Sequence, residues 1–344
     1  MRLSDFDYHL PRELIAQHPI EKRDRSRLLV LNKTGKIEHR YFYEITSYLN
    51  PGDVLVLNDT KVIPTKLLGK NPKTKREVEF LLFDSPRDYA RLPGKTRNKA
   101  IWEALAKPAK QAKKGSRWQF PQGVWAEVAE VLSGGSRLLH FEFEGDFFEL
   151  LEKIGHTPLP PYIRRDAEKS DEGRYQTVYA HSPGACAAPT AGLHFTRRLL
   201  DEIHSRGVKI TRITLHVGPG TFLPVRSEVV EDHQMWPEYY EINQEAAETI
   251  KKARGRVIVV GTTTVRALET GPTEPTSGWT DLFIYPGFKF RVVDALITNF
   301  HLPKSTLLML VAAFVGWERV LTAYQEAIQK RYRFYSYGDA MFIL

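Results

Sequence analysis

The chain has 344 residues, of which 42% are hydrophobic, 26% charged and 11% aromatic, and this composition is typical of a globular protein. It excludes disordered, collagen-like and coiled-coil proteins. The formal net charge is +8, and the single cysteine, Cys186, excludes both an internal disulfide and a zinc site built from thiolates.

The sequence contains no segment typical of export or membrane insertion. The first residues mix acidic and basic side chains, and the longest apolar run, at 307–317, is too short to cross a bilayer. We therefore expect a cytoplasmic protein without a membrane partner. Because the sequence has neither heptads nor a long apolar surface stripe, we expect a monomer.

The first 61 residues predict a small β part. Residues 28–31 and 37–42 flank a turn at 32–36, which favours a hairpin, and a strand follows at 54–57. Three strands are too few to fold alone. We expect them to join an element that comes later in the chain.

The pattern changes after Lys61. Short segments with partial alternation of apolar and polar residues are separated by Gly, Pro and Lys clusters; they lie at 76–83, 100–106, 116–120, 124–132 and 137–145. This pattern predicts an all-β module, a small β-barrel, followed by a short helix at 146–155. We assign residues 62–155 to this inserted minor domain.

The positive charge is concentrated in one stretch. Residues 61–118 contain sixteen basic and five acidic side chains, so this stretch carries +11 and the rest of the chain −3. Such a surface attracts a phosphate backbone, because each neutralised phosphate releases condensed counterions. The alternative is a lysine-rich, solvated surface on a thermostable protein. If the partner is RNA, Lys110, Lys113 and Lys114 are the contacts we expect.

The remainder of the chain predicts a different class of fold. Helices are expected at 195–207, 244–255 and 305–330, and strands at 208–218, 238–243, 256–262 and 294–300. Their alternation predicts an α/β domain made of residues 1–61 and 156–344, interrupted by the barrel. A Pro-rich connector at 157–162 leads into a polar run at 164–173, for which we expect a mobile surface loop; the sequence does not show whether this loop closes on a ligand.

Two loops rich in glycine, threonine and histidine come first among the candidate sites. Thr190, Gly192 and His194 lie just before a predicted helix, where free amides and hydroxyls bind anions or sugar oxygens. The second loop, residues 216–222, follows a predicted strand and contains four candidates: His216, Gly218, Gly220 and Thr221. The alternatives are a helix cap with a structural histidine in the first loop and a strained turn in the second.

Two further segments have the same strand-to-loop form. In 259–266 a strand leads through Gly-Thr into a helix, with Arg266 as a charge partner for an anion. In 296–305 Asn299 and His301 follow a strand. The aromatic and basic residues at 331–342 suit either base stacking or packing on the core. The sequence lacks the CxxC, HExxH, GxSxG, P-loop and kinase motifs, and no spacing indicates a metal site.

Read together, three ordered motifs identify a family. The segments YQTVYAHSPGACAAPTAGLHFT, HVGPGTFLPV and LITNFHLPKSTLLMLVAAF resemble the S-adenosylmethionine:tRNA ribosyltransferase-isomerase family of queuosine biosynthesis. The resemblance extends to the opening DFDYHLPRELIAQHPIEKRDRSRLLVL, to NDTKVIPTKLLG and to the closing YRFYSYGDAMFI. Cys186 and the pair Thr65-Lys66 are minor departures from the expected pattern.

The resemblance implies an α/β major domain with an inserted β-barrel. It also implies that the ribosyl group of S-adenosylmethionine is transferred to 7-aminomethyl-7-deazaguanine at the tRNA wobble position. The products are epoxyqueuosine-tRNA, adenine and methionine. S-adenosylmethionine is then a consumed substrate, and no cofactor or metal is implied. The RNA partner is the anticodon stem-loop.

Residue roles are hypotheses at this stage. The sulfonium acidifies the adjacent 5′ carbon, so His194 or His216 is predicted as the base, and the residues do not decide between them. Thr190 and the glycines and threonine of the two loops are predicted to line the substrate pocket, with Arg266, Asn299 and His301 as further candidates. Aromatic rings that would stabilise the sulfonium are Phe195, Phe222 and Tyr285.

Two other functions compete with this one. An RNA methyltransferase would share both substrates and release S-adenosylhomocysteine, although the sequence lacks the glycine-rich loop expected after an early strand. An RNA-binding protein or chaperone would use the basic module and the aromatic tail alone, and would bind without turnover.

Overall fold

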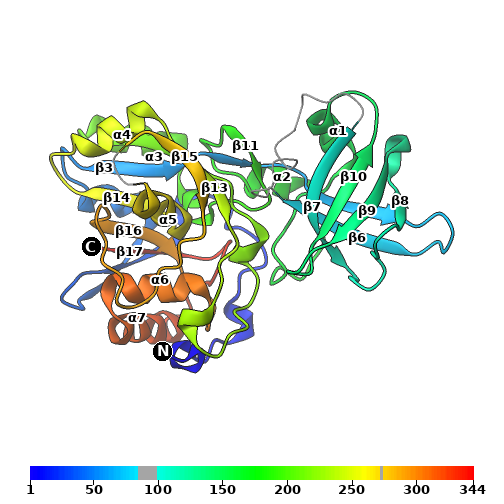
Figure 1. Ribbon diagram of the computed structural model, residues 1–344. Coiled ribbons are helices and arrows are strands. Elements are labelled where there is room, and N and C mark those ends of the chain that lie inside the picture. The colour runs from blue at the N-terminus through cyan, green and yellow to red at the C-terminus, as the bar shows by residue number, and fades with distance from the viewer. Residues whose placement is uncertain (84–98, 272–273) are drawn as a thin grey trace.

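The computed structural model describes residues 1–83, 99–271 and 274–344. They form a large mixed sheet with helices on both faces and, beside it, a closed β-barrel (Figure 1). The predicted fold class, an α/β part with an inserted small β-barrel, is confirmed. The domain boundaries at 61/62 and 155/156 stay a prediction.

The large sheet has the strand order β15-β13-β12-β3-β14-β16-β17-β1-β2. In chain order its strands are β1 (Arg27–Leu31), β2 (Ile37–Tyr41), β3 (Val54–Asn58), β12 (Lys209–Leu215), β13 (Glu238–Ile242), β14 (Val257–Val260), β15 (Thr276–Thr280), β16 (Ala295–Asn299) and β17 (Ala340–Ile343). The central strands β12, β3, β14 and β16 are parallel to their neighbours in this group. Their carboxyl ends therefore meet at one edge of the sheet, where open α/β sheets bind ligands.

Helices cover both faces of the sheet because its central strands are apolar on both sides. In β3, Val54 and Val56 face one core cluster, whereas Leu55 and Leu57 face the other. The first face is covered by α4 (Gln244–Lys251), α5 (Thr262–Thr270), α6 (Thr306–Val315) and α7 (Trp317–Gln329). The second is covered by α3 (Arg197–Ser205) and the 3₁₀ segment Phe42–Tyr48. Further 3₁₀ segments are Leu3–Phe6, Arg12–Leu14, Arg23–Arg25, Pro121–Gly123, Thr190–His194, Pro219–Thr221 and Val230–Asp232.

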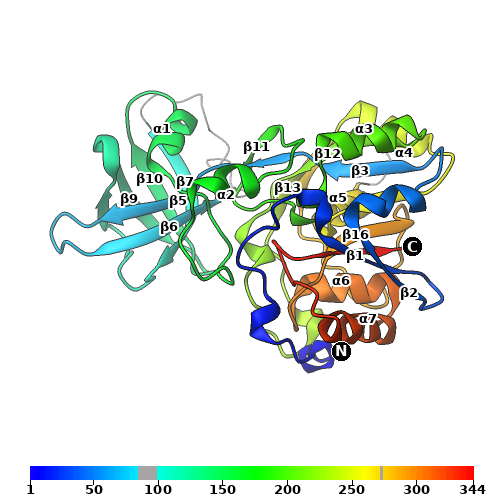
Figure 2. The same cartoon turned by 180° about the vertical axis from the view of Figure 1, so that it is seen from behind.

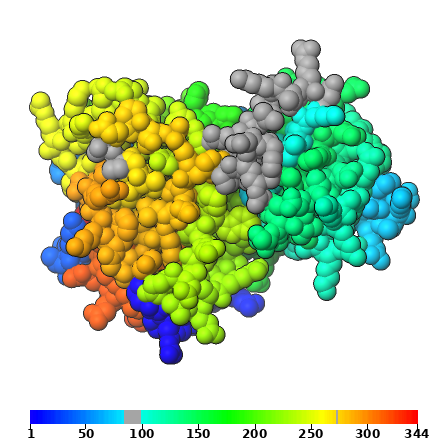
Figure 3. All heavy atoms as spheres, in the orientation of Figure 1, coloured from blue at the N-terminus to red at the C-terminus, as the bar shows by residue number. Residues whose placement is uncertain are grey.

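The barrel closes in the order β10-β7-β6-β5-β8-β9. Its strands are β5 (Lys66–Lys70), β6 (Glu77–Phe83), β7 (Lys99–Lys107), β8 (Arg117–Gln119), β9 (Trp125–Val131) and β10 (Arg137–Glu142). Helix α1 (Phe147–Ile154) packs on the barrel core through Phe147, which stacks on Trp102. A short parallel pair, β4 (Thr60–Val62) with β11 (Ser182–Ala185), connects the two parts (Figure 2). Figure 3 shows the barrel, in cyan and green, beside the larger part.

The helix predicted at 305–330 is two helices. Gly316 lies between α6 and α7 with a φ of 92°, a backbone conformation that glycine adopts readily. The helices are bent by 115° at this break. In the described part of the chain no single helix is long and apolar enough to cross a membrane; α6 and α7 reach that length and composition only as this bent pair.

The run at 164–173, predicted to be a mobile loop, is anchored. It contains the start of α2 (Lys169–Arg174), and the side chain of Asp171 is fully buried. Arg165 donates to both oxygens of Asp171 at 2.6 and 2.8 Å, and the hydroxyl of Tyr337 donates to Oδ1 at 2.7 Å. The sequence-based expectation missed these long-range partners. It also missed β17, which places the aromatic tail in the core.

Candidate active site

The four motif segments meet at one cavity, called here the first cavity. Thr190 comes from the 3₁₀ segment before α3, Thr221 and Phe222 from the loop after β12, Thr262 and Thr263 from the start of α5, and Asn299 and His301 from the end of β16. Three of these segments follow parallel strands. The sheet therefore brings together loops that lie up to about a hundred residues apart in the sequence.

A chain of hydrogen bonds fixes the wall of the first cavity. Thr190 Oγ1 donates to Asn299 Oδ1 at 2.9 Å, and Asn299 Nδ2 lies 3.1 Å from His194 Nε2. The same Nδ2 also donates to the carbonyl of Asp339 at 3.5 Å, which favours this orientation of the amide. His194 Nε2 therefore accepts, and Nδ1 carries the proton toward Ser26 Oγ at 2.7 Å.

His194 lies behind the wall and not on it. It is 4% exposed, and both its ring nitrogens have partners within the protein. Burial, together with the nearby charges of Arg23 and Arg333, lowers the pKa of His194 to about 3. The ring is neutral and holds Asn299, so the geometry gives it a positioning role and does not favour the predicted role as a base.

His301 is the histidine among the described lining residues of the first cavity. Its Nε2 lies 2.8 Å from Thr298 Oγ1, and its main-chain N–H donates to Tyr324 Oη at 3.0 Å. Burial lowers the pKa of His301 to about 3, so its imidazole is neutral at physiological pH. The second-ranked histidine of the sequence analysis is thus the one that the fold presents to the first cavity.

His216 lines a different and smaller space, called here the second cavity. Its Nδ1 lies 2.8 Å from Thr60 Oγ1, and its ring stacks on Tyr239 with 5.8 Å between centroids. Val217 lines both cavities, so the 216–222 loop separates them.

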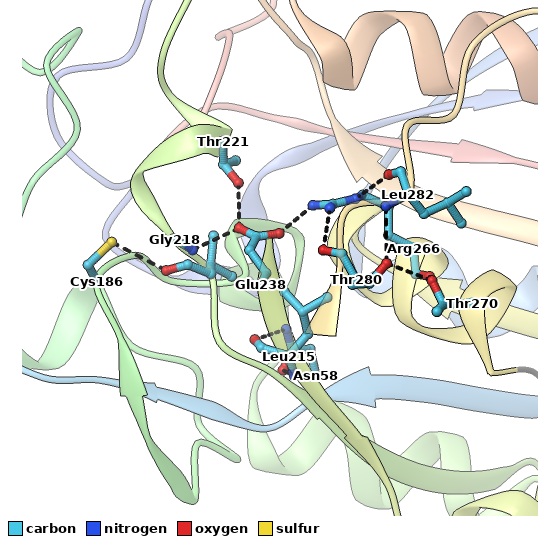
Figure 4. Close-up of polar contacts among 11 residues, drawn as sticks. Asn58, Cys186, Leu215, Gly218, Thr221, Glu238, Arg266, Thr270, Thr280 and Leu282 are labelled. Carbon is cyan, nitrogen blue, oxygen red and sulfur yellow. Dashed lines mark hydrogen bonds and ion pairs between the residues drawn. The ribbon is translucent and has the colours of Figure 1, made fainter. Parts of the chain in front are cut away.

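A buried carboxylate holds the 216–222 loop (Figure 4). Glu238 Oε1 accepts from the N–H of Gly218 at 2.7 Å and from Thr221 Oγ1 at 3.2 Å. Its Oε2 pairs with Arg266, whose Nε donates to the carbonyl of Leu282 at 2.8 Å. Arg266 and Glu238 are 3% and 2% exposed. Arg266 therefore supports the loop from behind and is not a lining residue, in contrast to the expectation that it binds an anion.

Two of the predicted pocket glycines are packing positions. A methyl group on Gly192 would collide with the hydroxyl of Tyr179, and one on Gly220 would lie 2.7 Å from Cβ of Trp236. Neither glycine is a lining residue of the first cavity. Gly218, in contrast, lines the second cavity.

The three predicted aromatic rings separate in the structure. Phe222 lines the first cavity, as expected. Phe195 is fully buried and packs edge-on against Phe42. It has an extended backbone between the 3₁₀ segment and α3, and its side chain belongs to the core on that face of the sheet. Tyr285 packs beside Phe283 and is outside the described lining of both cavities.

Known proteins of one family match this chain over its whole length. The family described as "Queuosine biosynthesis protein" matches residues 3–343. A relative from Acetivibrio thermocellus, named S-adenosylmethionine:tRNA ribosyltransferase-isomerase, is 53% identical, and one of the same name from Clostridium kluyveri is 51% identical; each match covers 100% of both chains. This chain belongs to that family. The resemblance predicted from the sequence is confirmed.

A solved structure is similar over its whole length. The crystal structure of S-adenosylmethionine tRNA ribosyltransferase from Thermotoga maritima matches with a TM-score of 0.55 and 38% identity, covering 99% of this chain and 100% of that one. The match therefore spans both the α/β part and the barrel of this member of the ribosyltransferase-isomerase family.

Among the lining residues that sequence reasoning missed in this ribosyltransferase-isomerase family member, Tyr162, Tyr335 and Ser336 are polar side chains from outside the four motif segments. The hydroxyls of Tyr162 and Ser336 form a hydrogen bond, and the rings of Tyr162 and Tyr335 are 3.9 Å apart. The aromatic composition of the tail was a signal. The missing information was that β17 carries the tail back to the cavity.

The predicted RNA contacts lie on the barrel. Lys110, Lys113 and Lys114 are exposed in the connection between β7 and β8. Residues 84–98, which carry part of the basic stretch, lie outside the described residues. Within the described ranges no group of three or more His, Cys, Asp or Glu side chains is arranged to hold a metal ion.

Proposed function

We propose that this chain transfers and isomerises the ribosyl group of S-adenosylmethionine onto 7-aminomethyl-7-deazaguanine at the tRNA wobble position, giving epoxyqueuosine-tRNA, adenine and methionine. The chain is a full-length member of the family that carries this name. The observation that carries the proposal is the convergence of four separate motif segments on the first cavity.

The first cavity suits S-adenosylmethionine. Its wall offers hydroxyls from Thr190, Thr221 and Thr298, which can bind the ribose and the amino acid part. Thr262 and Thr263, at the start of α5, add main-chain N–H groups that favour a carboxylate. Aromatic faces at Tyr162, Phe222 and Tyr335 can stabilise the sulfonium.

The first step of the reaction is removal of a proton from the 5′ carbon of S-adenosylmethionine. The positive sulfur acidifies the 5′ carbon, and a base at the first cavity must take that proton; His301 is the histidine among the described lining residues, although burial lowers its pKa to about 3 and so weakens it as a base. Adenine then departs as a proton or hydrogen bond reaches its ring nitrogens. The aminomethyl nitrogen bonds to the ribosyl carbon from which adenine has left with the electron pair of the glycosidic bond, and this nitrogen gives up one proton. Closure of the epoxide breaks the carbon–sulfur bond and expels neutral methionine.

One incubation tests the reaction. The purified protein is mixed with S-adenosylmethionine and an anticodon stem-loop containing 7-aminomethyl-7-deazaguanine, and adenine, methionine and RNA mass are followed together. Release of adenine and methionine with an RNA mass gain equal to the ribosyl fragment is the expected result. S-adenosylhomocysteine would instead identify a methyltransferase, and binding without turnover would identify an RNA-binding protein.

The remaining sequence-based expectations stay predictions. They are a cytoplasmic location, a monomeric state, the anticodon stem-loop as the RNA partner, and a reaction that needs no metal or other cofactor. Sedimentation of the protein alone and with the stem-loop tests whether the protein is a monomer. Turnover that survives treatment with a metal chelator is the expected result for the last.

A further inference from the structure

A row of paired residues runs along the edge of the sheet from the first cavity to the last strand, β2. Asn299, in the wall of the first cavity, pairs with Ala340 of β17, which pairs with Leu28 of β1. The residue before it, Arg27, pairs with Tyr41 at the end of β2. Three strand spacings separate β16 from β2, a distance of about 14 Å. The end of β2 is therefore within reach of an RNA whose base enters the first cavity.

Aromatic rings and an arginine form an exposed stack at this end of β2. The rings of Tyr41 and Tyr43 are parallel to within 7°, with 5.8 Å between their centroids. The guanidinium carbon of Arg25 lies 4.7 Å from the centroid of the Tyr43 ring. Tyr41 is 47% exposed and Arg25 is exposed as well. We call these three residues the tyrosine stack; exposed rings beside arginine are the kind of surface on which unpaired nucleobases stack.

Positive charge lies beside the tyrosine stack. Arg27, the strand partner of Tyr41, donates to the carbonyl of Lys330 at 2.8 Å and to that of Arg331. Lys330 and Arg331 are both exposed. The nearby carboxylate of Glu44 accepts a hydrogen bond from the main-chain N–H of Tyr41 at 2.7 Å. The charge of this surface therefore suits the phosphate backbone of RNA.

The tyrosine stack is also connected to the wall of the first cavity. Phe42, which lies between the two tyrosines in the sequence, stacks on His194 with 5.0 Å between ring centroids. Ser26, next to Arg25, forms a hydrogen bond with Nδ1 of His194 at 2.7 Å, and the other ring nitrogen holds Asn299. The stack and the wall therefore form one packed unit, so the distance between them is fixed.

We propose that the tyrosine stack receives a nucleobase of the anticodon loop that flanks the wobble position, while the neighbouring cations contact the phosphates. This inference rests on the proposed function, because that reaction brings the wobble base to the first cavity. In the sheet order β3, whose continuation β4 leads to the barrel, and β2 lie on opposite sides of β16. An RNA that contacts both the barrel and the tyrosine stack therefore crosses the end of β16, where the first cavity lies.

Paired changes in protein and RNA test the stacking. Tyr41 is replaced by Ala and, as the matched control, by Phe. The RNA is an anticodon stem-loop that contains 7-aminomethyl-7-deazaguanine, used complete or with an abasic site at each other loop position in turn. Tyr41→Ala should raise the Kd for the complete RNA about tenfold, whereas Tyr41→Phe, which keeps a ring, should stay close to the unchanged protein. One abasic RNA, the one that lacks the stacked base, should bind Tyr41→Ala and the unchanged protein equally well.

Two results would overturn the stacking site. One is a Tyr41→Ala variant that loses no affinity, or loses the same affinity for the complete RNA and for every abasic RNA. The other comes from the unchanged protein, which needs no variant to fold. Nitration of Tyr41 by tetranitromethane should slow about tenfold when the complete stem-loop is saturating, because a stacked base covers the ring. An unchanged rate rejects the site, and slowing that follows protein concentration without RNA assigns the surface to a second copy of the chain.

Adenine release is measured in parallel to separate this inference from the proposed function. Turnover without coupling between Tyr41 and a loop base rejects the stacking site alone. Coupling between Tyr41 and a loop base without any adenine release by the unchanged protein rejects the function and leaves only the RNA contact.

Discussion

At the scale of single residues, surroundings decide what identical side chains do. His194 and His301 are both buried and both neutral, yet His194 has a protein partner on each ring nitrogen and His301 faces the first cavity. His216 lines the second cavity instead. The three histidines look equivalent in the sequence, because each is a polar residue near the end of a strand or before a helix.

His301→Gln tests the assignment at the first cavity. Loss of a proton acceptor should lower kcat by about 100-fold or more, with a smaller change in KM, because the side chain acts on the reacting carbon. The readout is the rate of adenine release at saturating substrates. The matched control is His204→Gln, an exposed position on α3, which should leave kcat unchanged. A wild-type kcat for His301→Gln would remove this residue from proton transfer.

The two buried histidines also predict how stability depends on pH. In the unfolded chain a histidine gains a proton below about pH 6.5, whereas the folded pKa of His194 and His301 is about 3, lowered by burial. The unfolded state therefore binds more protons, and stability is lost as the pH falls below about 6.5. Each histidine should cost about 1.5 kcal/mol between pH 6.5 and pH 5. Denaturant unfolding measures this loss, and the Gln variants should each show a shallower one; parallel curves for variant and unchanged protein would contradict the prediction.

At the scale of elements, the sheet places the motifs and a buried ion pair fixes one of them. The parallel strands β12, β14 and β16 end at the same edge, so the loops that follow them share the first cavity. The 216–222 loop is irregular and needs a further constraint. Glu238, at the start of β13, supplies it by accepting hydrogen bonds from Gly218 and Thr221.

Glu238→Gln tests this constraint. The amide can keep a hydrogen bond to the loop but leaves the buried guanidinium of Arg266 without its counter-charge, which should lower the free energy of unfolding by about 3 kcal/mol. KM for S-adenosylmethionine should rise because Thr221 lines the first cavity. Glu241→Gln, exposed on the same strand, should change neither quantity. The double variant Glu238→Gln with Arg266→Met should recover part of the lost stability; if it loses as much as the two single changes added together, the pair is not coupled.

At the scale of the whole molecule, the barrel places exposed lysines on the same side of the junction as the second cavity. The α/β part holds the first cavity, and the junction with the barrel holds the second. Arg137 ties the lysine-bearing loop to the turn next to Trp236. The lysine-bearing loop of the barrel is therefore tied to the junction with the α/β part.

Neutralising Lys110, Lys113 and Lys114 together to Gln should weaken binding of the anticodon stem-loop and flatten its salt dependence. The slope of log Kd against log salt should fall in magnitude by about 2, because up to three phosphate contacts no longer release counterions. The control with the same change in charge replaces Lys33, Lys251 and Lys252, which are exposed on the α/β part. An unchanged slope for the barrel variant would place the RNA on another surface.

The sequence by itself determined the fold class, the family and the segments that form the site. Alternating apolar residues separate the barrel strands from the two-sided apolar strands of the sheet, and long ordered motifs such as HVGPGTFLPV are specific to the family. Local patterns of this kind depend on neighbours in the chain, so they can be read without the structure.

Only the tertiary structure decided which side chains face each cavity. The partners of His194, Glu238 and Asp171 lie between 6 and 168 residues away along the chain, and no local pattern reports such contacts. The break at Gly316 and the return of the tail as β17 were also hidden, because both depend on how the last helices pack against the sheet. Burial and hydrogen-bond partners, which set the charge and direction of a side chain, arise only when distant segments meet.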